Sequence, residues 1–498
     1  MLKKLLGLSG TSKQESLRSA ARVAESANDF QKAAALRRAL TEMDPGSAQA
    51  WDALGETLRK AGRQGEALAA YEKALALGAP AKALHMTVGA LCLSLGRHTE
   101  AIDHFSQIVA DDPDNADALC MLGAALNDLR RHAEAATYFQ RALLLQPAHS
   151  QSHFNLGLAH FERGDLDAAS ASFVRCAALR RGEPWTGDLA AQLVLDHHPR
   201  FAPMDMAVNE IKIRHDCEQI AYLLGLEKLP PAYRDVLADY RALYEEIRGR
   251  VDAFSLEAFD PARHPLVART YKRPMFISDD VQPEESLIDP GLDCREIEDR
   301  YLAAQPNLVV CDGLLTPAAM RLVRRFCRES TFWNNIKPGY LGSYFYDGFC
   351  SRLLLRLAWE LREKLPRVIQ GKPLQMMWGY KCDSTLPGLG VHADEAAVNV
   401  NFWITEDEAN LDSEHGGLLV YTHDAPRDWG FARFNNDSQA ILDYLNSVGS
   451  VPVCVPYRAN RAVIFDSDLF HATDRPRFRE GYLSRRINIT LLYGLRSA

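Results

Sequence analysis

A regular spacing of about 34 residues, kept over four copies in the N-terminal third of the chain, is the feature that most restricts its fold. Three residue types keep this spacing: a glycine, an alanine and an aromatic residue. The glycines are Gly55, Gly89, Gly123 and Gly157, the alanines are Ala67, Ala101, Ala135 and Ala169, and the aromatics are Tyr71, Phe105, Phe139 and Phe173. A period of this length is typical of stacked supersecondary units, each of which buries its apolar face against the next. The sequence therefore predicts a solenoid.

We expect each unit to be a pair of short antiparallel helices. The small glycine and alanine allow neighbouring helices to approach closely, and the aromatic residue fills the gap between successive pairs. Pro113 and Pro147 follow the second helix of two units, where the chain turns and the missing backbone donor of proline is tolerated. Trp51 and Leu54-Gly55 open one unit in the pattern Trp-x-x-Leu-Gly.

These residues resemble the tetratricopeptide repeat. The resemblance covers about residues 14–183, with clear copies from residues 48, 82, 116 and 150. A degenerate copy from residue 14 keeps Ala33 and Pro45 but has Ala21 and Arg37 in place of the glycine and the aromatic, as expected for an end copy whose outer face meets water. The resemblance implies that residues 1–183 form a groove that binds a protein or a peptide. The alternative is an array that only assembles the protein or spaces its other domain.

Composition and charge exclude several classes of protein. The length of 498 residues suits two to four domains. A net charge of −8 provides no general basic surface for nucleic acid or anionic lipid. No apolar run is long enough and free enough of charge to suggest a membrane span, and the start of the chain lacks the apolar run of a signal peptide. The ten cysteines, without a Cys-x-x-Cys pair, fit reduced thiols better than a disulfide framework or a zinc knuckle. We therefore expect a cytoplasmic protein; the oligomeric state stays open.

Residues 184–300 lose the period and are expected to form a helical cap and a linker. Apolar residues at helical spacing predict helices over 209–224 and 232–250. Residues 251–300 are rich in Pro and Asp and are expected to be a long loop.

Residues 301–498 have a different pattern, in which short apolar strands dominate. A helix is expected from Thr316-Pro317 to Arg328, because Thr caps a helix and Pro suits its first position. A second helix is expected over 351–365. The predicted strands are 308–311, 374–382, 397–405, 417–421, 451–455, 461–465 and 486–493. Two helices beside many antiparallel strands favour a helix-backed sandwich or barrel of the jelly-roll type.

Three residues of this region have the chemistry of a metal site. His392 and Asp394 are separated by a single residue, so they project to one side of a strand end. His471 comes much later in the chain and is expected on a neighbouring strand. Two imidazoles and one carboxylate occupy one face of an octahedral iron and leave three positions open, as oxygen activation requires.

A second set of residues suits an acidic cosubstrate. Arg486 and Thr490 share one face of the last strand, which follows His471 in the chain. If 2-oxoglutarate chelates the metal through its 2-oxo acid end, its far carboxylate needs a buried, always-charged partner, and arginine forms a bidentate pair with it. Arg485 points to the other side and is our second choice. The alternative is that both arginines only close the surface of the barrel.

Together these motifs resemble the 2-oxoglutarate- and Fe(II)-dependent oxygenases, most closely the prolyl-hydroxylase-like branch. Tyr380 lies shortly before His392, where that branch often has a tyrosine near the cosubstrate. The Gly416-Gly417 turn and the run from Phe465 to His471 also match, whereas Asn399 and Asn401 stand where tyrosines are common. The resemblance implies a double-stranded β-helix with His392, Asp394 and His471 as metal ligands. Arg486, Thr490, Tyr380 and Asn401 are implied as cosubstrate contacts.

The same resemblance implies an activity. Members of the family use Fe(II), 2-oxoglutarate and dioxygen, sometimes with ascorbate, and hydroxylate a C–H bond while 2-oxoglutarate becomes succinate and carbon dioxide. Tyr340, Tyr344 and Tyr346 are candidates for a lid over the open metal face. We interpret Trp378 as core and His415 and His423 as surface-loop residues.

Four functions remain open from the sequence. The first is a hydroxylase acting on a protein or peptide held by the repeats. The second is a small-molecule hydroxylase in which the repeats serve assembly, and the third is a non-catalytic repeat scaffold. The fourth is a barrel that uses zinc or manganese for isomerisation or hydrolysis.

Overall fold

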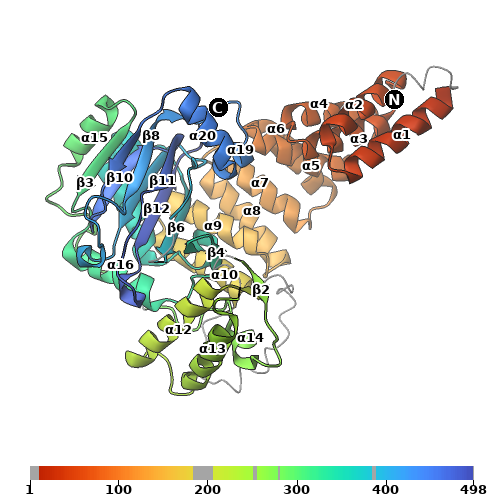
Figure 1. The fold of residues 1–498 in the computed structure, drawn as a ribbon. Helices are drawn as coiled ribbons and strands as arrows, with labels where there is room; N and C mark the ends of the chain where they lie inside the picture. Colours follow the sequence, from red (N-terminus) through yellow and green to blue (C-terminus); the bar gives the residue numbers. More distant parts are fainter. Residues whose placement is uncertain (1–9, 183–205, 251–254, 279–280, 384–387, 497–498) are drawn as a thin grey trace. The chain divides into compact units, whose positions relative to one another are not determined.

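The structure is a computed structural model that describes residues 10–182, 206–250, 255–278, 281–383 and 388–496 (Figure 1). It divides into two compact units, Met1–Ala159 and His160–Ala498. The expected domain boundary at residue 183 lies outside the described residues, and the boundary at residue 300 stays a prediction.

The N-terminal part is an array of helices, as the repeat period predicts. The helices are α1 (Gly10–Ser26), α2 (Phe30–Met43), α3 (Ala48–Lys60), α4 (Gln64–Ala76), α5 (Ala81–Ser94), α6 (His98–Asp111), α7 (Ala116–Asp128), α8 (His132–Leu145), α9 (Ser150–Glu162) and α10 (Leu166–Arg181). Ser47 and Asn115 are the N-cap residues of α3 and α7, and each side chain accepts a hydrogen bond from the backbone N–H three residues later.

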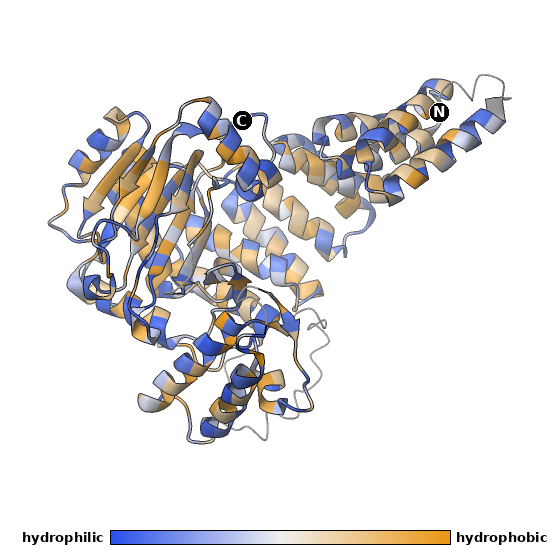
Figure 2. Ribbon diagram, in the orientation of Figure 1, coloured by the Kyte–Doolittle hydropathy of each residue, from blue (hydrophilic) through white to orange (hydrophobic). Residues whose placement is uncertain are grey.

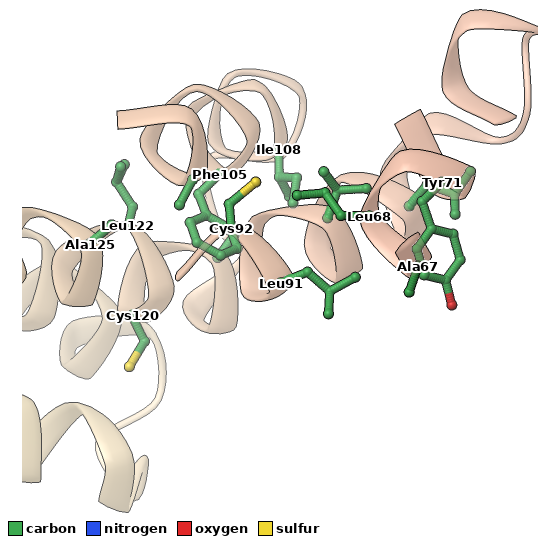
Figure 3. Packing of buried hydrophobic residues seen from close by; sticks show 14 of the residues in the cluster. Ala67, Leu68, Tyr71, Leu91, Cys92, Phe105, Ile108, Cys120, Leu122 and Ala125 are labelled. Carbon is green, nitrogen blue, oxygen red and sulfur yellow. The ribbon is translucent and has the colours of Figure 1, made fainter. Parts of the chain in front are cut away.

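The repeated glycine faces the repeated aromatic of the same unit. A Cβ atom added to Gly89 would lie 2.6 Å from the ring of Phe105, and one added to Gly55 would lie 2.8 Å from the ring of Tyr71. Tyr71 and Phe105 belong to one continuous buried apolar cluster that runs through the array (Figure 3). The glycine is therefore needed because the aromatic ring occupies the place of its side chain.

The next helices are α12 (Glu210–Gly225) and α13 (Tyr233–Ile247), as predicted, followed by α14 (Pro265–Thr270) and α15 (Cys294–Ala303). The expectation of one long loop over 251–300 was wrong for α14 and α15. The first N–H groups of α14 donate to Asp239 of α13, at 2.8 Å from Leu266 and 3.0 Å from Val267. This tertiary cap has no local sequence signal. Helix α12 contacts α16 and the short helix η5 (Tyr482–Ser484), and the expected cap on the last repeat stays a prediction.

The rest of the chain is β-rich, with two antiparallel sheets. The seven-stranded sheet has the order β3 (Leu308–Asp312), β10 (Arg461–Asp466), β7 (Val398–Trp403), β12 (Ile487–Tyr493), β6 (Leu374–Cys382), β5 (Tyr340–Tyr344) and β4 (Asn335–Lys337). The three-stranded sheet has the order β11 (Leu469–Thr473), β8 (Leu418–Asp424) and β9 (Pro452–Val455).

The two sheets share an apolar core. One buried cluster combines Val463 and Phe465 of the large sheet with Val420, Val455 and Leu469 of the small sheet. Colouring by hydropathy shows the strands of this region as largely apolar (Figure 2). Within the described residues the sheets are not joined into a closed barrel.

Helices accompany the sheets as predicted. Thr316 caps α16 (Pro317–Glu329), where its side chain accepts from Ala319 N at 3.2 Å. Helix α17 (Arg352–Lys364) is tied to the large sheet, because the Tyr493 hydroxyl donates to the Ala358 carbonyl at 2.8 Å. Further short elements are η3 (Phe345–Asp347), α18 (Pro366–Ile369), η4 (Asp407–Ala409), α19 (Phe431–Asn436) and α20 (Ser438–Ser447). In the part of the chain that the structure describes, no helix is both long enough and apolar enough to cross a membrane.

Candidate metal and anion pocket

The backbone brings His392 and His471 together. The two residues form an antiparallel bridge, in which His392 N donates to His471 O at 3.0 Å and His471 N donates to His392 O at 2.8 Å. His471 lies on β11, whereas His392 lies outside the named strands. The pair is thus fixed by main-chain hydrogen bonds despite its separation in sequence.

The side chains of His392, Asp394 and His471 converge on one point. One ligand atom from each lies within 4.8 Å of the others. His471 Nε2 is 3.4 Å from Asp394 Oδ2, and His392 Nε2 is 3.9 Å from Asp394 Oδ1. The three residues that the sequence predicts as ligands are therefore close enough to bind one cation.

Both imidazoles present the same nitrogen to this point. His392 Nδ1 lies 2.9 Å from Gly390 O, and His471 Nδ1 lies 3.1 Å from Leu469 O. Since a carbonyl accepts, Nδ1 carries the proton in each neutral ring and Nε2 keeps its lone pair. Outer contacts of this kind orient metal-binding histidines.

Burial and mutual charge keep the site ready for a cation. Burial, and then the charge of His471, lower the pKa of His392 to about 4. Burial alone would raise the pKa of Asp394, but its interactions with His471, His392 and Asn399 lower that pKa overall. Asn399 Nδ2 also donates to Asp394 Oδ2 at 2.8 Å. An ionised carboxylate and a neutral His392 are the protonation states that metal binding requires.

A pocket opens beside these residues on the inner face of the large sheet. Its lining combines His392, Asp394 and His471 with residues of the sheets, namely Trp378, Tyr380, Leu389, Asn401, Leu418, Ala472, Thr473, Arg486, Asn488 and Thr490. Strand register explains the sheet side of the pocket: Thr490 pairs with Asn401 of β7 and with Trp378 of β6. All four cosubstrate residues named from the sequence thus line the same pocket as the three metal-ligand candidates.

Arg486 is a buried cation whose hydrogen-bond partners are uncharged. Its exposed fraction is 2%. Its Nε donates to Gly416 O at 2.7 Å and its Nη2 to Gly417 O at 3.1 Å. Its Nη1 lies 3.2 Å from Asn488 Oδ1 and 3.5 Å from Cys382 Sγ. Within the described residues no carboxylate pairs with Arg486. Because a buried charge without a counter-charge is costly, the pocket favours an anionic ligand.

Arg485 has the opposite environment. It pairs with Asp383 and with Glu218 of α12, at 2.9 Å in both cases. Arg214 also pairs with Asp383. The charge of Arg485 is therefore compensated, and only Arg486 lines the pocket.

Two buried polar atoms that lack hydrogen-bond partners indicate that the pocket suits a polar ligand. Asn401 Nδ2 donates to Thr490 Oγ1 at 2.9 Å, but Asn401 Oδ1 has no partner among the described residues. Trp378 Nε1 is likewise buried without a partner there. Buried polar atoms without partners are costly, so a polar ligand fits the pocket better than apolar packing does.

Two of the three tyrosines proposed as a lid lie on a strand next to β6. Tyr340 and Tyr344 lie on β5, which is hydrogen-bonded to β6. The Tyr344 hydroxyl lies 3.3 Å from that of Tyr380, and Tyr346 stacks on Tyr344 with ring centroids 5.6 Å apart. The glycine-rich run concealed this paired strand, and the lid formed by the three tyrosines stays a prediction.

The sequence interpretation missed several pocket residues. Trp378 belongs to a buried apolar cluster, as predicted, but it also lines the pocket beside Tyr380 on the same face of β6. Asn488 lies between Arg486 and Thr490 at strand spacing, so the period of two could have identified it. Asn399 supports Asp394 from behind, and no sequence signal marked that contact.

The comparisons with known proteins concern the repeats. A family model described as "Tetratricopeptide repeat" matches residues 18–82, 93–146 and 120–183. No curated protein matches the chain.

Among solved structures, YrrB, a tetratricopeptide-repeat protein "with an unusual peptide-binding site", is 21% identical; the match covers 32% of this chain and 82% of that one, with a TM-score of 0.30. A MamA structure is also 21% identical, covering 31% and 91%, with a TM-score of 0.29. MamA from Desulfovibrio magneticus RS-1 is 19% identical, covering 32% and 92%, with a TM-score of 0.31. The match to the family model and the regular period show that the N-terminal region is built of tetratricopeptide repeats.

Proposed function

We propose that the chain is a dioxygenase dependent on 2-oxoglutarate and Fe(II) that hydroxylates a C–H bond. The observation that carries the proposal is a buried, uncompensated guanidinium, that of Arg486, in one pocket with three convergent metal-ligand candidates. A zinc or manganese isomerase or hydrolase would need the same three ligands but would not need Arg486. The two facing antiparallel sheets support a double-stranded β-helix as the architecture.

The residues of the site fit both absent groups. His392 Nε2, His471 Nε2 and a carboxylate oxygen of Asp394 would hold Fe(II), in agreement with the two-histidine, one-carboxylate set of non-haem iron oxygenases. When bound, iron supplies the oxygen activation that amino-acid side chains cannot provide. Arg486 would pair with the far carboxylate of 2-oxoglutarate, and the hydroxyl of Thr490, which lines the same pocket, would join it.

The residues around the pocket orient the ligand side chains and Arg486, and they exclude water. Gly416 O and Gly417 O hold the guanidinium plane of Arg486. Asn399 orients Asp394, and the Gly390 and Leu469 carbonyls orient the two imidazoles. Trp378 and Tyr380, which are 7% and 8% exposed, form an apolar wall beside the pocket. Such fixed geometry lowers the entropic cost of reaction.

We further propose that the substrate is a protein or peptide bound by the repeats. Support comes from the family model, because tetratricopeptide arrays present grooves to partner chains. The array also carries a mixed polar and apolar depression lined by residues such as Trp51, Leu54, Arg38, Glu66 and Lys73. This side-chain mixture suits an extended peptide.

The activity is tested by succinate formation from 2-oxoglutarate. The full chain is incubated with Fe(II), 2-oxoglutarate and ascorbate, and succinate is measured. We expect iron-dependent succinate in the wild type, loss to background in His392→Ala, and unchanged turnover in His423→Ala, because His423 lies on β8 outside the pocket lining. Equal turnover in His392→Ala and the wild type would refute the ligand assignment.

The substrate class is tested with labelled dioxygen. The full chain is incubated with a protein extract, Fe(II), 2-oxoglutarate and ¹⁸O₂, and labelled peptides are identified by mass spectrometry. Lys73→Glu reverses an exposed charge of the repeat depression and is expected to reduce labelling while leaving succinate formation without substrate unchanged. Label found only in small molecules would favour the small-molecule hydroxylase.

A further inference from the structure

A second cluster of metal-ligand side chains lies at one end of the small sheet. His415 comes just before β8, Cys454 lies on β9, and Asp474 directly follows β11. The strand register aligns these positions, since Leu418 pairs with Thr473 on one side and with Val455 on the other. Three segments distant in sequence thus bring an imidazole, a thiol and a carboxylate together.

The distances within this cluster suit one small cation. His415 Nδ1 lies 2.9 Å from Asp474 Oδ2, and Cys454 Sγ lies 3.3 Å from the same oxygen. One ligand atom of each residue lies within 4.8 Å of the others. Ligand bonds of about 2.0–2.3 Å at tetrahedral angles put neighbouring donor atoms roughly 3.3–3.5 Å apart. Only small side-chain movements are therefore needed to receive an ion.

The burial of the cluster is graded from its base to the surface. Asp474 is 2% exposed, His415 is intermediate, and Cys454 is exposed. The carboxylate is thus fixed by the fold, and the outer side of the cluster remains accessible to water and to an incoming ion. This arrangement corresponds to three protein ligands with one open position.

The donor set indicates which ion would bind. A thiolate and a carboxylate together balance the double charge of a divalent cation, and the neutral imidazole adds a third bond. Thiolate and imidazole ligands favour zinc over harder cations such as Mg²⁺, and zinc also binds such donors more strongly than Fe²⁺ does. We propose that His415, Cys454 and Asp474 form a second metal site, which takes a zinc-like divalent cation and leaves its fourth position to water.

Arg475 occupies part of this site in the structure. Its Nη2 lies 2.8 Å from His415 Nε2 and 3.3 Å from His415 Nδ1, and its Nε lies 3.6 Å from Asp474 Oδ1. The Arg475 side chain is 75% exposed, so it can move into solvent when a cation replaces its charge. The guanidinium then acts as a competitor of the ion.

The second metal site lies next to the Gly416-Gly417 turn that holds Arg486. Gly416 and Gly417, whose carbonyls accept from Arg486, follow His415 in the chain. Gly416 N donates to Asp474 O at 3.0 Å, and Asp474 N donates to Gly417 O at 3.3 Å. A cation bound by His415 and Asp474 would therefore fix the turn that holds Arg486, and binding itself does not depend on the proposed iron chemistry.

Cobalt is the probe that separates this site from the pocket. Co²⁺ bound to a thiolate gives a charge-transfer absorption in the near ultraviolet, whereas two histidines and a carboxylate give none. We expect this absorption when Co²⁺ is added to the full-length Asp394→Ala chain, and we expect Zn²⁺ to abolish it by displacement. Adding Cys454→Ser should remove the band, whereas adding Cys294→Ser, at another partly accessible cysteine, should leave it.

Zinc stoichiometry provides the second measurement. The Asp394→Ala chain should retain one equivalent of zinc after desalting, and the further change His415→Gln should remove it without changing the far-ultraviolet circular dichroism. A cobalt band that is absent, or that survives Cys454→Ser, would overturn the proposal. Zinc retained equally by the His415→Gln chain would overturn it as well.

Discussion

The repeats and the β-rich region organise their residues in different ways. In the repeats one contact recurs, so the Gly55–Tyr71 and Gly89–Phe105 pairs have the same role in successive units. In the β-rich region each role occurs once, and His392 meets His471 only through sheet pairing across the chain. Local, repeated contacts build the array, whereas the pocket depends on the register of strands that are distant in sequence.

The largest expected effect on stability is in the repeats. Phe105 is fully buried in the apolar cluster, so Phe105→Ala should reduce the free energy of unfolding by about 3–5 kcal/mol. Because contacts within the array are local, the loss of stability should be confined to the repeats. Hydrogen exchange of the full chain measures where protection is lost. An equal loss of protection in β6 and β12 would contradict an effect confined to the repeats.

A comparable effect is expected from a long-range ion pair of the β-rich unit. Asp347 pairs with Arg180 at 3.2 Å and with Arg181 at 3.1 Å, and it also accepts from Asn335. Burial alone would raise its pKa, but the two arginines and Asn335 lower it overall. Asp347→Asn should reduce the free energy of unfolding by about 3 kcal/mol at neutral pH, because the buried carboxylate is lost and the partly buried guanidinium of Arg181 loses its partner.

The sign of the pH dependence follows from that lowered pKa. A carboxyl whose folded pKa lies below its unfolded value stabilises the fold fully above the unfolded pKa and loses this contribution as pH falls through the folded pKa. The difference between wild type and Asp347→Asn should therefore be full at neutral pH and shrink below about pH 4. Asp167→Asn, at an exposed partner of Arg352, should change stability little at any pH. Denaturant unfolding at several pH values measures both variants.

A smaller effect is expected on ligand binding in the pocket. Arg486→Met should weaken 2-oxoglutarate binding by about 2 kcal/mol or more, roughly 30-fold in the dissociation constant. Glu218→Gln changes a partner of Arg485, which points away from the pocket, and should leave that dissociation constant unchanged. Calorimetric titration in the presence of a redox-inert divalent metal measures both. Equal affinities in Arg486→Met and wild type would show that the anion does not contact Arg486.

The smallest effects distinguish one glycine from another. Gly89→Ala should destabilise the array by about 1–2 kcal/mol, because its Cβ would meet the Phe105 ring at 2.6 Å. A Cβ atom added to Gly65 has nothing within 4 Å. Gly65→Ala should therefore leave the stability of the array unchanged or raise it by up to about 1 kcal/mol, since alanine favours the helix. Thermal unfolding of the two variants is the measurement, and a similar shift in both would contradict the packing role of the repeated glycine.

The repeats could be predicted from the sequence more completely than the β-rich region. The helices of the repeats follow from the period, and β6 and α16 follow from alternation and a Thr-Pro cap. The ligand candidates were found by residue chemistry, since no local pattern brings His392 to His471. The cap of α14 by Asp239 and the contact of Asn399 with Asp394 could not be predicted. The strand under Tyr340 and Tyr344 was also missed, because its register is set by β6, which lies beyond α17 and α18 along the chain.

The most direct test is anaerobic spectroscopy of the full chain with Fe(II) and 2-oxoglutarate. A 2-oxo acid that chelates protein-bound Fe(II) gives a visible charge-transfer absorption without any need for the hydroxylation substrate. We predict that this absorption forms in the wild type with one equivalent of Fe(II), is abolished in Asp394→Ala, and needs far more 2-oxoglutarate in Arg486→Met. No absorption in the wild type, or the same absorption in Asp394→Ala, would contradict the assignment of the pocket.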